Sequence, residues 1–378
     1  MEAPPRQRLN PSGFLRSSEG LPYLLVPFIP IAIVLDVANV SSVVIFFCSA
    51  LGVIPTAALM GRATEELAAR SGPGIGGLLN VTFGNAPELI IALFALQKGL
   101  DEVVKASLIG SVIGNTLLVL GAAMFFGGLG RDRQFFNRVS ASAQSSMLLL
   151  AVTAMVMPAI YELVKGHGLP LPGAQRITFD HTVEHLSLAV AIVLILSYGA
   201  SLIFSLKTHR DLFNPPHEAE EGAPEPWTIR RSIVMLAIAG VAVGVMSEIL
   251  VDSITDAAHS IGLTEFFVGV IVVAIVGNAA EHWVAVLVAR RDRMDLSVNI
   301  AIGSSAQVAL FVAPVLVLCS FFIGPGPMPL VFNGFELGGI ILAVLIANQV
   351  THEGESTWFE GIQLLAVYLV LALAFAFA

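Results

Sequence analysis

The chain has 378 residues, of which 56% are hydrophobic and only 12% are charged, and its net charge is −9. Soluble domains carry about 25% charged residues, so this composition excludes a soluble globular protein and predicts an all-α polytopic membrane protein. The net charge does not indicate a nucleic-acid partner, because most charges of such a protein lie in its loops. We therefore expect the lipid bilayer, and no nucleic acid, around this chain.

The first residues and the two cysteines exclude further classes. Arg6, Arg8 and Arg16 lie in a segment rich in Pro and Gly, and no short apolar segment with a small-residue cleavage site follows. We expect no cleaved signal peptide and assign residues 1–20 to an N-terminal cytoplasmic segment. Cys48 and Cys319 lie in apolar runs, which is typical of packing residues and provides neither a disulfide framework nor a metal cluster.

Apolar segments long enough to cross a bilayer as helices follow one another along the rest of the chain. We predict eleven of them, at residues 21–38, 43–61, 73–97, 104–127, 142–163, 184–205, 230–251, 264–289, 296–323, 330–350 and 357–378. We expect a leading helix, a five-helix unit, a linker and a second five-helix unit, which correspond to residues 21–38, 43–205, 206–229 and 230–378.

The basic residues predict the orientation of these spans. With a cytoplasmic N-terminus, alternating the loops between the two sides leaves only Lys98, Lys105, Lys165 and Arg176 outside, and the other 15 of the 19 Lys and Arg lie inside. Cytoplasmic loops carry an excess of Lys and Arg. The sequence therefore predicts an integral membrane protein with its N-terminus in the cytoplasm, its C-terminus outside and an odd number of spans.

The linker is the longest polar stretch between spans. Between Lys207 and Trp227 it carries four glutamates and four prolines, with the glutamates at Glu218, Glu220, Glu221 and Glu225. We interpret it as a linker between two units, and the alternative for its acidic run is a plain solvated loop. Because five is odd, the two five-helix units enter the membrane from opposite sides. Inverted repeats are typical of secondary transporters, which bind their substrate at the repeat interface near the midplane.

One motif occurs in both units. Gly84-Asn85-Ala86-Pro87-Glu88 returns as Gly277-Asn278-Ala279-Ala280-Glu281, at an offset of 193 residues (277 − 84). The same offset relates Gly110-Ser111 to Gly303-Ser304. Because two separate polar patches share one offset, we interpret the chain as a duplication with one membrane-embedded glutamate in each copy.

The two glutamates require a chemical reason. A carboxylate at the centre of a membrane helix costs about 2.5–3.5 kcal/mol on insertion scales, and neither Glu88 nor Glu281 has a Lys or Arg within the preceding helical turn. Such a pair persists by binding a cation or by binding protons, since a low dielectric disfavours the charged form. A site that does both in turn exchanges a divalent cation for protons. The alternative is a structural pair in which each glutamate is held by its own helix start.

The backbone around each motif is expected to contribute oxygen ligands. Asn-x-x-Glu is a helix-start pattern, and Gly84 with Pro87, and Gly277 in the second copy, favour a break in the helix. The free carbonyls of a broken helix are hard ligands suited to Ca²⁺. The predicted metal-binding residues are Glu88, Glu281, Asn85, Asn278, Gly84 and Gly277.

Two further groups of polar residues are candidates for supporting roles. The second polar patch contains Ser111 and Asn115 in one unit and Ser304 and Gln307 in the other, at spacings that share a helix face; Gly-Ser pairs also serve close helix packing. A proton or ion access route is predicted along Glu65, Glu248, Asp252 and His282. The alternatives are charges that face water at the membrane interface and, for His282, a packing role.

At these motifs the sequence resembles the cation/proton exchanger (CAX) family of Ca²⁺/H⁺ antiporters, within the wider cation/Ca²⁺ antiporter superfamily. The segment from Gly303 to Gln307 and the loop opening at Lys207 are similar to that family too. Sodium-coupled relatives carry a Gly-Ser/Thr-Ser-type core at the place where this chain has Gly-Asn-Ala. The resemblance implies eleven helices, two inverted five-helix repeats, Ca²⁺ between the repeat glutamates and an acidic element in the linker, here Glu218 to Glu225. It also implies a prokaryotic inner-membrane protein, because the long N-terminal extensions of some plant members are absent.

The sequence therefore predicts a transporter that exchanges Ca²⁺ for H⁺, with both as transported ions and no cofactor. Within transport, the alternatives are Mn²⁺ as the cation, or Na⁺ in place of H⁺. An intramembrane metal hydrolase would need a His-Glu-x-x-His spacing, which Glu281-His282 lacks, so we do not expect an enzyme. A passive channel would place charges in rings around a continuous pore. The sequence indicates no particular oligomeric state.

Overall fold

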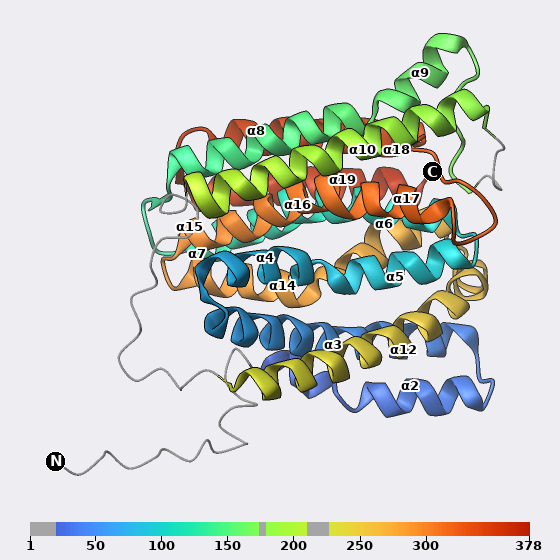
Figure 1. The fold of residues 1–378 in the computed structure, drawn as a ribbon, viewed down its shortest axis with the longest axis horizontal. Helices are drawn as coiled ribbons and strands as arrows, with labels where there is room; N and C mark the ends of the chain where they lie inside the picture. The colour runs from blue at the N-terminus through green and yellow to red at the C-terminus, as the bar shows by residue number, and fades with distance from the viewer. Residues whose placement is uncertain (1–19, 174–178, 210–226) are drawn as a thin grey trace.

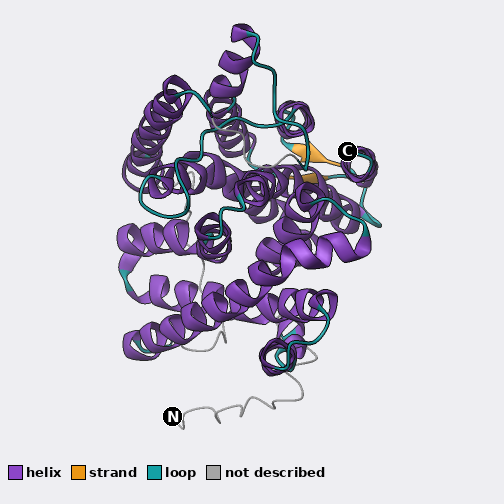
Figure 2. Cartoon of the chain, turned by 90° about the vertical axis from the view of Figure 1, so that its right-hand side faces the viewer, coloured by secondary structure: helices purple, strands orange, loops and turns teal. Residues whose placement is uncertain are grey.

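The computed structural model describes residues 20–173, 179–209 and 227–378. The predicted N-terminal segment, apart from residue 20, and the acidic run Glu218 to Glu225 lie outside the described residues. Helices run roughly parallel to one long axis, with one very short strand pair at one end (Figures 1 and 2). The prediction of an all-α membrane protein is confirmed in these residues.

The first half contains the helices before the linker. In chain order these are η1 (Leu21–Leu25), α2 (Phe28–Val37), α3 (Ser42–Arg70), α4 (Gly72–Gly84), α5 (Ala86–Gln97), α6 (Asp101–Ile113), η2 (Gly114–Val119), α7 (Leu120–Gly128), α8 (Arg138–Met155), α9 (Met157–Lys165), α10 (His181–Ile203) and η3 (Phe204–Thr208). Here η1 is a 3-10 helix, whereas η2 and η3 are π-helical turns that continue an α-helix.

The second half follows the linker. Its helices are α12 (Ile229–Ile261), α13 (Glu265–Phe267), η4 (Val268–Val273), α14 (Ala274–Arg290), α15 (Met294–Val298), η5 (Asn299–Gly303), α16 (Ser304–Gln307), η6 (Val308–Val312), α17 (Ala313–Ser320), α18 (Gly334–Thr351) and α19 (Trp358–Ala376). Strand β1 (Gln134–Phe135) of the first half pairs antiparallel with β2 (Glu355–Ser356) of the second.

All eleven predicted spans coincide with helices. By length and composition, nine helices of the described residues can cross a membrane, and the pair Ile75–Gly84 and Ala86–Gln97, bent by 42°, would be a tenth. The predicted leading helix corresponds to the shorter apolar segment Leu21–Val37. The count of eleven spans therefore stays a prediction, while the segments themselves lie where the sequence predicts them.

Successive connections alternate between the two ends of the bundle (Figure 1). The connections α7–α8, α14–α15 and α18–α19 share one end, as the β1–β2 pair and a hydrogen bond from Arg131 to the carbonyl of Arg290 show. The connection α3–α4 lies at the same end in Figure 1. Among the described Lys and Arg, only three lie toward the other end: Lys98 after the end of α5, Lys105 near the start of α6 and Lys165 at the end of α9. We call the two ends the basic end and the opposite end.

Helices of the two halves interleave in the core. Helix α3 packs against α12, α6 against η4, α14 against α7, and α8 against α18. Glycine permits the closest of these approaches, because a Cβ at Gly110 would collide with the carbonyl of Val270, and one at Gly269 would lie 2.8 Å from the Cβ of Ala106. The predicted packing role of the Gly-Ser pair therefore holds for Gly110, and it places the middle of α6 directly beside the second half.

Candidate functional site

The two repeated motifs meet in the middle of the bundle. A Cβ at Gly84 would lie 3.7 Å from Oε1 of Glu281, and a Cβ at Gly277 would lie 3.2 Å from Cγ of Glu88. The glycine of each motif therefore lies against the glutamate of the other, and at Gly277 the approach is tight enough that a side chain would crowd Glu88. The two carboxylates are close enough to interact electrostatically. Gly84 and Gly277 were predicted as carbonyl ligands, and the structure adds a spacing role for Gly277, which one sequence motif alone does not reveal.

The backbone differs between the copies. Helix α4 ends at Gly84, Asn85 leaves the helical conformation (φ −95°, ψ 17°), and α5 starts at Ala86 with Pro87 in its first turn. The break predicted at Gly277 is wrong, because α14 runs without interruption from Ala274 to Arg290. The physical reason is that Ala280 stands where the first copy has Pro87. Proline lacks the N–H that would bond to the carbonyl four residues earlier, and its ring clashes with that carbonyl.

The asparagines of the motifs bind across the two halves. Asn85 lies at the start of α5 but makes no side-chain cap, so the predicted capping interaction is wrong. Its Nδ2 instead donates to Oε1 of Gln307 at 2.6 Å. Nδ2 of Asn278 donates to Oγ of Ser111 at 3.0 Å and to the carbonyl of Ala274 at 2.9 Å. The Oδ1 atoms of both asparagines are buried without a hydrogen-bond partner, and each remains available as an oxygen ligand.

The two glutamates have different surroundings. Oε2 of Glu281 accepts a hydrogen bond from Oγ of Ser304 at 2.7 Å. Both carboxylate oxygens of Glu88 are buried, and neither has a hydrogen-bond partner in another residue. Beside Glu88 lies a cavity of about 10 Å³, which Ser107 and Ser111 also line. A buried carboxylate without a partner is costly unless it is protonated or coordinates a cation.

The second polar patch contacts the motifs at every predicted position. Ser111, Ser304 and Gln307 bind Asn278, Glu281 and Asn85 as described above. Asn115 completes the set, with its Oδ1 2.9 Å from Nε2 of His282. His282 therefore belongs to the central network and not to an outer route. Ser107 was not among the predicted residues; its spacing of four from Ser111 on α6, which puts both on one helix face, is the signal that could have identified it.

The outer acidic residues form separate groups at the two ends. Glu65, toward the basic end of α3, is exposed and acts electrostatically on Glu281. Glu248 and Asp252, toward the opposite end of α12, are exposed too. Asp252 pairs with Lys98 at 2.8 Å, and this hydrogen bond, helped by the charges of Asp252 and Glu248, raises the pKa of Lys98. The residues of the predicted access route therefore do not form one group: Glu65 lies on one side of the central site and Glu248 with Asp252 on the other, and the route itself stays a prediction.

The donor set is one of hard oxygen atoms. Within the described residues, no group of three or more His, Cys, Asp or Glu side chains is placed to hold a metal ion. The centre instead offers two carboxylates, two free amide oxygens and serine hydroxyls. Oxygen ligands of this kind suit Ca²⁺, which takes six to eight of them and completes its shell with water or carbonyls. The residues present therefore fit a divalent cation as cargo.

Comparisons with known proteins agree with this arrangement. A family profile described as "Sodium/calcium exchanger protein" matches residues 41–207 and 231–377. A Ca(2+)/H(+) antiporter of Aphanothece halophytica is 44% identical over 367 residues, which cover 93% of this chain and 95% of that protein. The Ca(2+)/H(+) antiporter ChaA of Bacillus subtilis (strain 168) is 44% identical over 356 residues, covering 93% and 97%.

Solved structures show the same fold. The structure of native YfkE superposes with a TM-score of 0.80 at 39% identity, covering 94% of this chain and 100% of that one. The crystal structure of the H+/Ca2+ exchanger CAX gives a TM-score of 0.69 at 16% identity, covering 96% and 93%. At that identity the second likeness concerns the fold alone.

Proposed function

The chain belongs to the sodium/calcium exchanger protein family, and from this premise we propose that it is a secondary transporter that exchanges Ca²⁺ for H⁺ across a membrane. Relatives named as Ca(2+)/H(+) antiporters match it at 44% identity over nearly their whole length. The observation that carries the proposal is Glu88, whose buried carboxylate has no hydrogen-bond partner in another residue and lies beside Glu281.

Charge balance explains the exchange. One Ca²⁺ neutralises Glu88 and Glu281, and two protons neutralise the same pair. Metal binding needs the deprotonated carboxylates, so binding of Ca²⁺ releases protons. The free Oδ1 atoms of Asn85 and Asn278 supply two further ligands. A state with both carboxylates charged and empty is costly in the low dielectric of the bundle. The site therefore changes sides only when loaded with Ca²⁺ or with protons, which couples the two fluxes.

We propose further that residues 43–205 and 230–378 are inverted repeats. Three observations support the duplication: the reciprocal contacts of Gly84 and Gly277, the shared offset of the motifs, and the span Met294–Ser320, which begins 193 residues after Asp101–Gly128 (294 − 101). The inversion is supported by direction, because α6 starts at the opposite end and α15 starts at the basic end. The gathering of Arg and Lys at the basic end supports a cytoplasmic location for that end. This orientation puts the C-terminus outside, and the bacterial relatives support a prokaryotic inner membrane as the location.

The test is uptake of ⁴⁵Ca²⁺ into sealed proteoliposomes that contain the purified full-length protein. An imposed pH gradient should drive uptake, and a Na⁺ gradient without a pH gradient should not. Uptake driven only by Na⁺ would replace H⁺ by Na⁺ as the coupling ion. Mn²⁺ in place of Ca²⁺ tests the cargo. Uptake that follows the Ca²⁺ gradient alone, without counterflow, would indicate a channel and overturn the proposal.

A further inference from the structure

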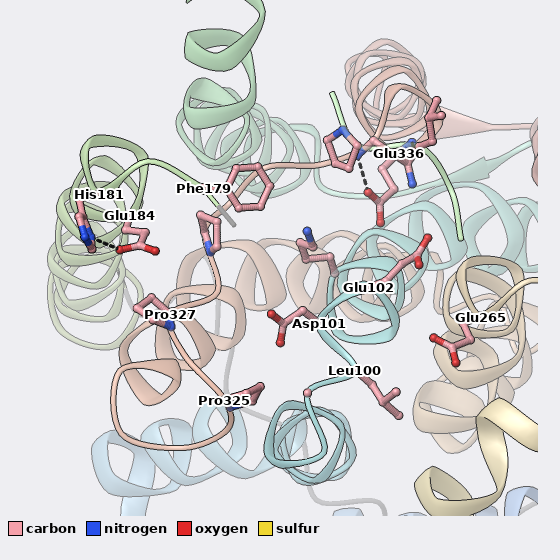
Figure 3. Close-up of a pocket in the computed structure, with 16 residues that line it drawn as sticks. Leu100, Asp101, Glu102, Phe179, His181, Glu184, Glu265, Pro325, Pro327 and Glu336 are labelled. Atoms are coloured by element: carbon pink, nitrogen blue, oxygen red, sulfur yellow. Dashed lines mark hydrogen bonds and ion pairs between the residues drawn. The ribbon is translucent and has the colours of Figure 1, made fainter. Parts of the chain in front are cut away.

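A second cavity lies at the opposite end of the bundle. It has a volume of about 680 Å³ and lies between the starts of α6, α10 and α18, the short helix α13 and the connection from α17 to α18 (Figure 3). This volume is within the range of about 300–1,000 Å³ of small-ligand sites. Glu102 on its wall and Ser111 in the central site are nine residues apart on α6, a rise of about 14 Å. The cavity is therefore separate from the central site.

The wall of this cavity is strongly acidic. Among its described residues, five carboxylates face one lysine, Lys105, and one histidine, His181; the carboxylates are Asp101, Glu102, Glu184, Glu265 and Glu336. Nζ of Lys105 donates to the carbonyl of Val331 at 2.9 Å, and Nδ1 of His181 lies 3.0 Å from Glu184. One lysine cannot balance five carboxylates. A concave wall with one sign of charge focuses the field and concentrates counter-ions.

Glu336 supplies a free ligand atom in this cavity. Its side chain is 2% exposed. Oε2 accepts from the backbone N–H of Asn333 at 2.8 Å and closes the capping box of α18, whereas Oε1 is buried without a hydrogen-bond partner. Figure 3 shows this carboxylate directed into the cavity, on the same side as Glu102. A buried carboxylate oxygen without a partner is costly unless a ligand satisfies it.

We propose that this cavity binds a hydrated divalent metal cation, held by Glu336 with Glu102. The described residues contain no group of three carboxylates close enough to bind a bare ion, and the cavity has room for an ion together with water ligands. Ca²⁺ accepts water in its shell, and Mg²⁺ dehydrates reluctantly. Oε1 of Glu336 then binds a metal-bound water, while Lys105 limits the negative charge of the empty cavity.

The test is equilibrium binding of ⁴⁵Ca²⁺ to the detergent-solubilised full-length protein carrying Glu88→Gln and Glu281→Gln. This background removes the central carboxylates. We expect residual binding of one ion per chain with a Kd of about 0.1–1 mM, the range of weak extracellular sites. Adding Glu336→Gln, which keeps the capping acceptor, should weaken it at least about tenfold. Lys105→Gln should tighten it, because it removes the one lysine charge and retains a donor for Val331.

The matched control is Asp256→Asn, which removes an exposed carboxylate of α12 near the same end but outside the cavity. Binding should be unchanged in this variant. No residual binding in the background, or equal losses in Glu336→Gln and Asp256→Asn, would overturn the proposal. If Glu88→Gln and Glu281→Gln together leave the full binding of the wild type, the central site of the proposed function fails instead. In that case the cavity proposal is tested by Glu336→Gln and by a second variant, Glu102→Gln, and it fails if neither variant weakens Ca²⁺ binding.

Discussion

The two copies of the repeated motif carry the same glutamate in different surroundings. Glu281 lies on an unbroken helix and is held by Ser304, whereas Glu88 follows a break at Asn85 and has no partner in another residue. One proline accounts for the difference in the backbone. The comparison suggests that the two exchanging carboxylates differ in how firmly they are held: Glu281 is the fixed half of the site, and Glu88 is the half without a side-chain partner.

The largest effect should come from removing either carboxylate. Glu88→Gln and Glu281→Gln should each reduce proton-driven ⁴⁵Ca²⁺ uptake at least about 100-fold, because one remaining carboxylate leaves the bound cation uncompensated, at a cost of about 3–5 kcal/mol. Glu353→Gln, at an exposed position of the basic end, is the control. Uptake at the wild-type rate in either well-folded variant would remove the pair from the mechanism.

A proline exchange tests the backbone difference itself. Ala280→Pro places in α14 the residue that the first copy has at Pro87, and it should destabilise the protein by about 3 kcal/mol, since it interrupts an intact helix. Pro87→Ala should cost much less, because Pro87 occupies the first turn of α5 where no helical N–H is lost. Thermal unfolding midpoints in detergent measure both. Equal losses of stability in the two variants would show that the two copies have the same backbone.

The serines should matter unequally. Ser304→Ala removes a hydrogen bond to the carboxylate of Glu281, a kind of bond that contributes about 1.5–3 kcal/mol. It should change the Ca²⁺ concentration for half-maximal uptake by about tenfold or more. Ser111→Ala removes a neutral hydrogen bond to Asn278, which keeps the carbonyl of Ala274 as an acceptor. We therefore expect the Ca²⁺ concentration for half-maximal uptake to change only about threefold. The reverse order would place the fixed half of the site at Glu88.

The outer ion pair should contribute least. Asp252→Asn should leave uptake within about twofold, because exposed pairs contribute little. The raised pKa of Lys98 gives a signed expectation for stability. The contribution of the pair is complete below the ordinary pKa of 10.5 and disappears as the pH rises through the raised value. Unfolding midpoints should therefore converge for wild type and Asp252→Asn above that pH, and a difference that grows there would contradict the assignment.

The orientation has its own test. In a background without Cys48 and Cys319, Ser260→Cys lies at the opposite end and Glu353→Cys at the basic end. A membrane-impermeant thiol reagent added to intact cells should label only the cysteine at position 260. Labelling only at position 353 would reverse the proposed orientation.

The sequence predicted the helices and the meeting of the motifs, because composition and a shared offset are properties of the chain itself. It did not predict which backbone copy breaks, since glycine permits a break and only Pro87 enforces one. The hydrogen-bond partners of Asn85 and Asn278 could not be predicted either, because the partner side chain lies in the opposite half of the chain in both cases. The acidic cavity around Glu336 is assembled from segments far apart in the sequence, and no local pattern indicates it.

The central claim is that Ca²⁺ and protons compete for Glu88 and Glu281. It is tested most directly by the rate of ⁴⁵Ca²⁺ transport as a function of Ca²⁺ concentration at several pH values on the side where Ca²⁺ binds. Competition predicts that lower pH raises the Ca²⁺ concentration for half-maximal transport and that saturating Ca²⁺ restores the maximal rate. A maximal rate that falls with pH at a constant half-saturating concentration would contradict a shared site and place the protons elsewhere, with Glu65 and Glu248 as the next residues to test.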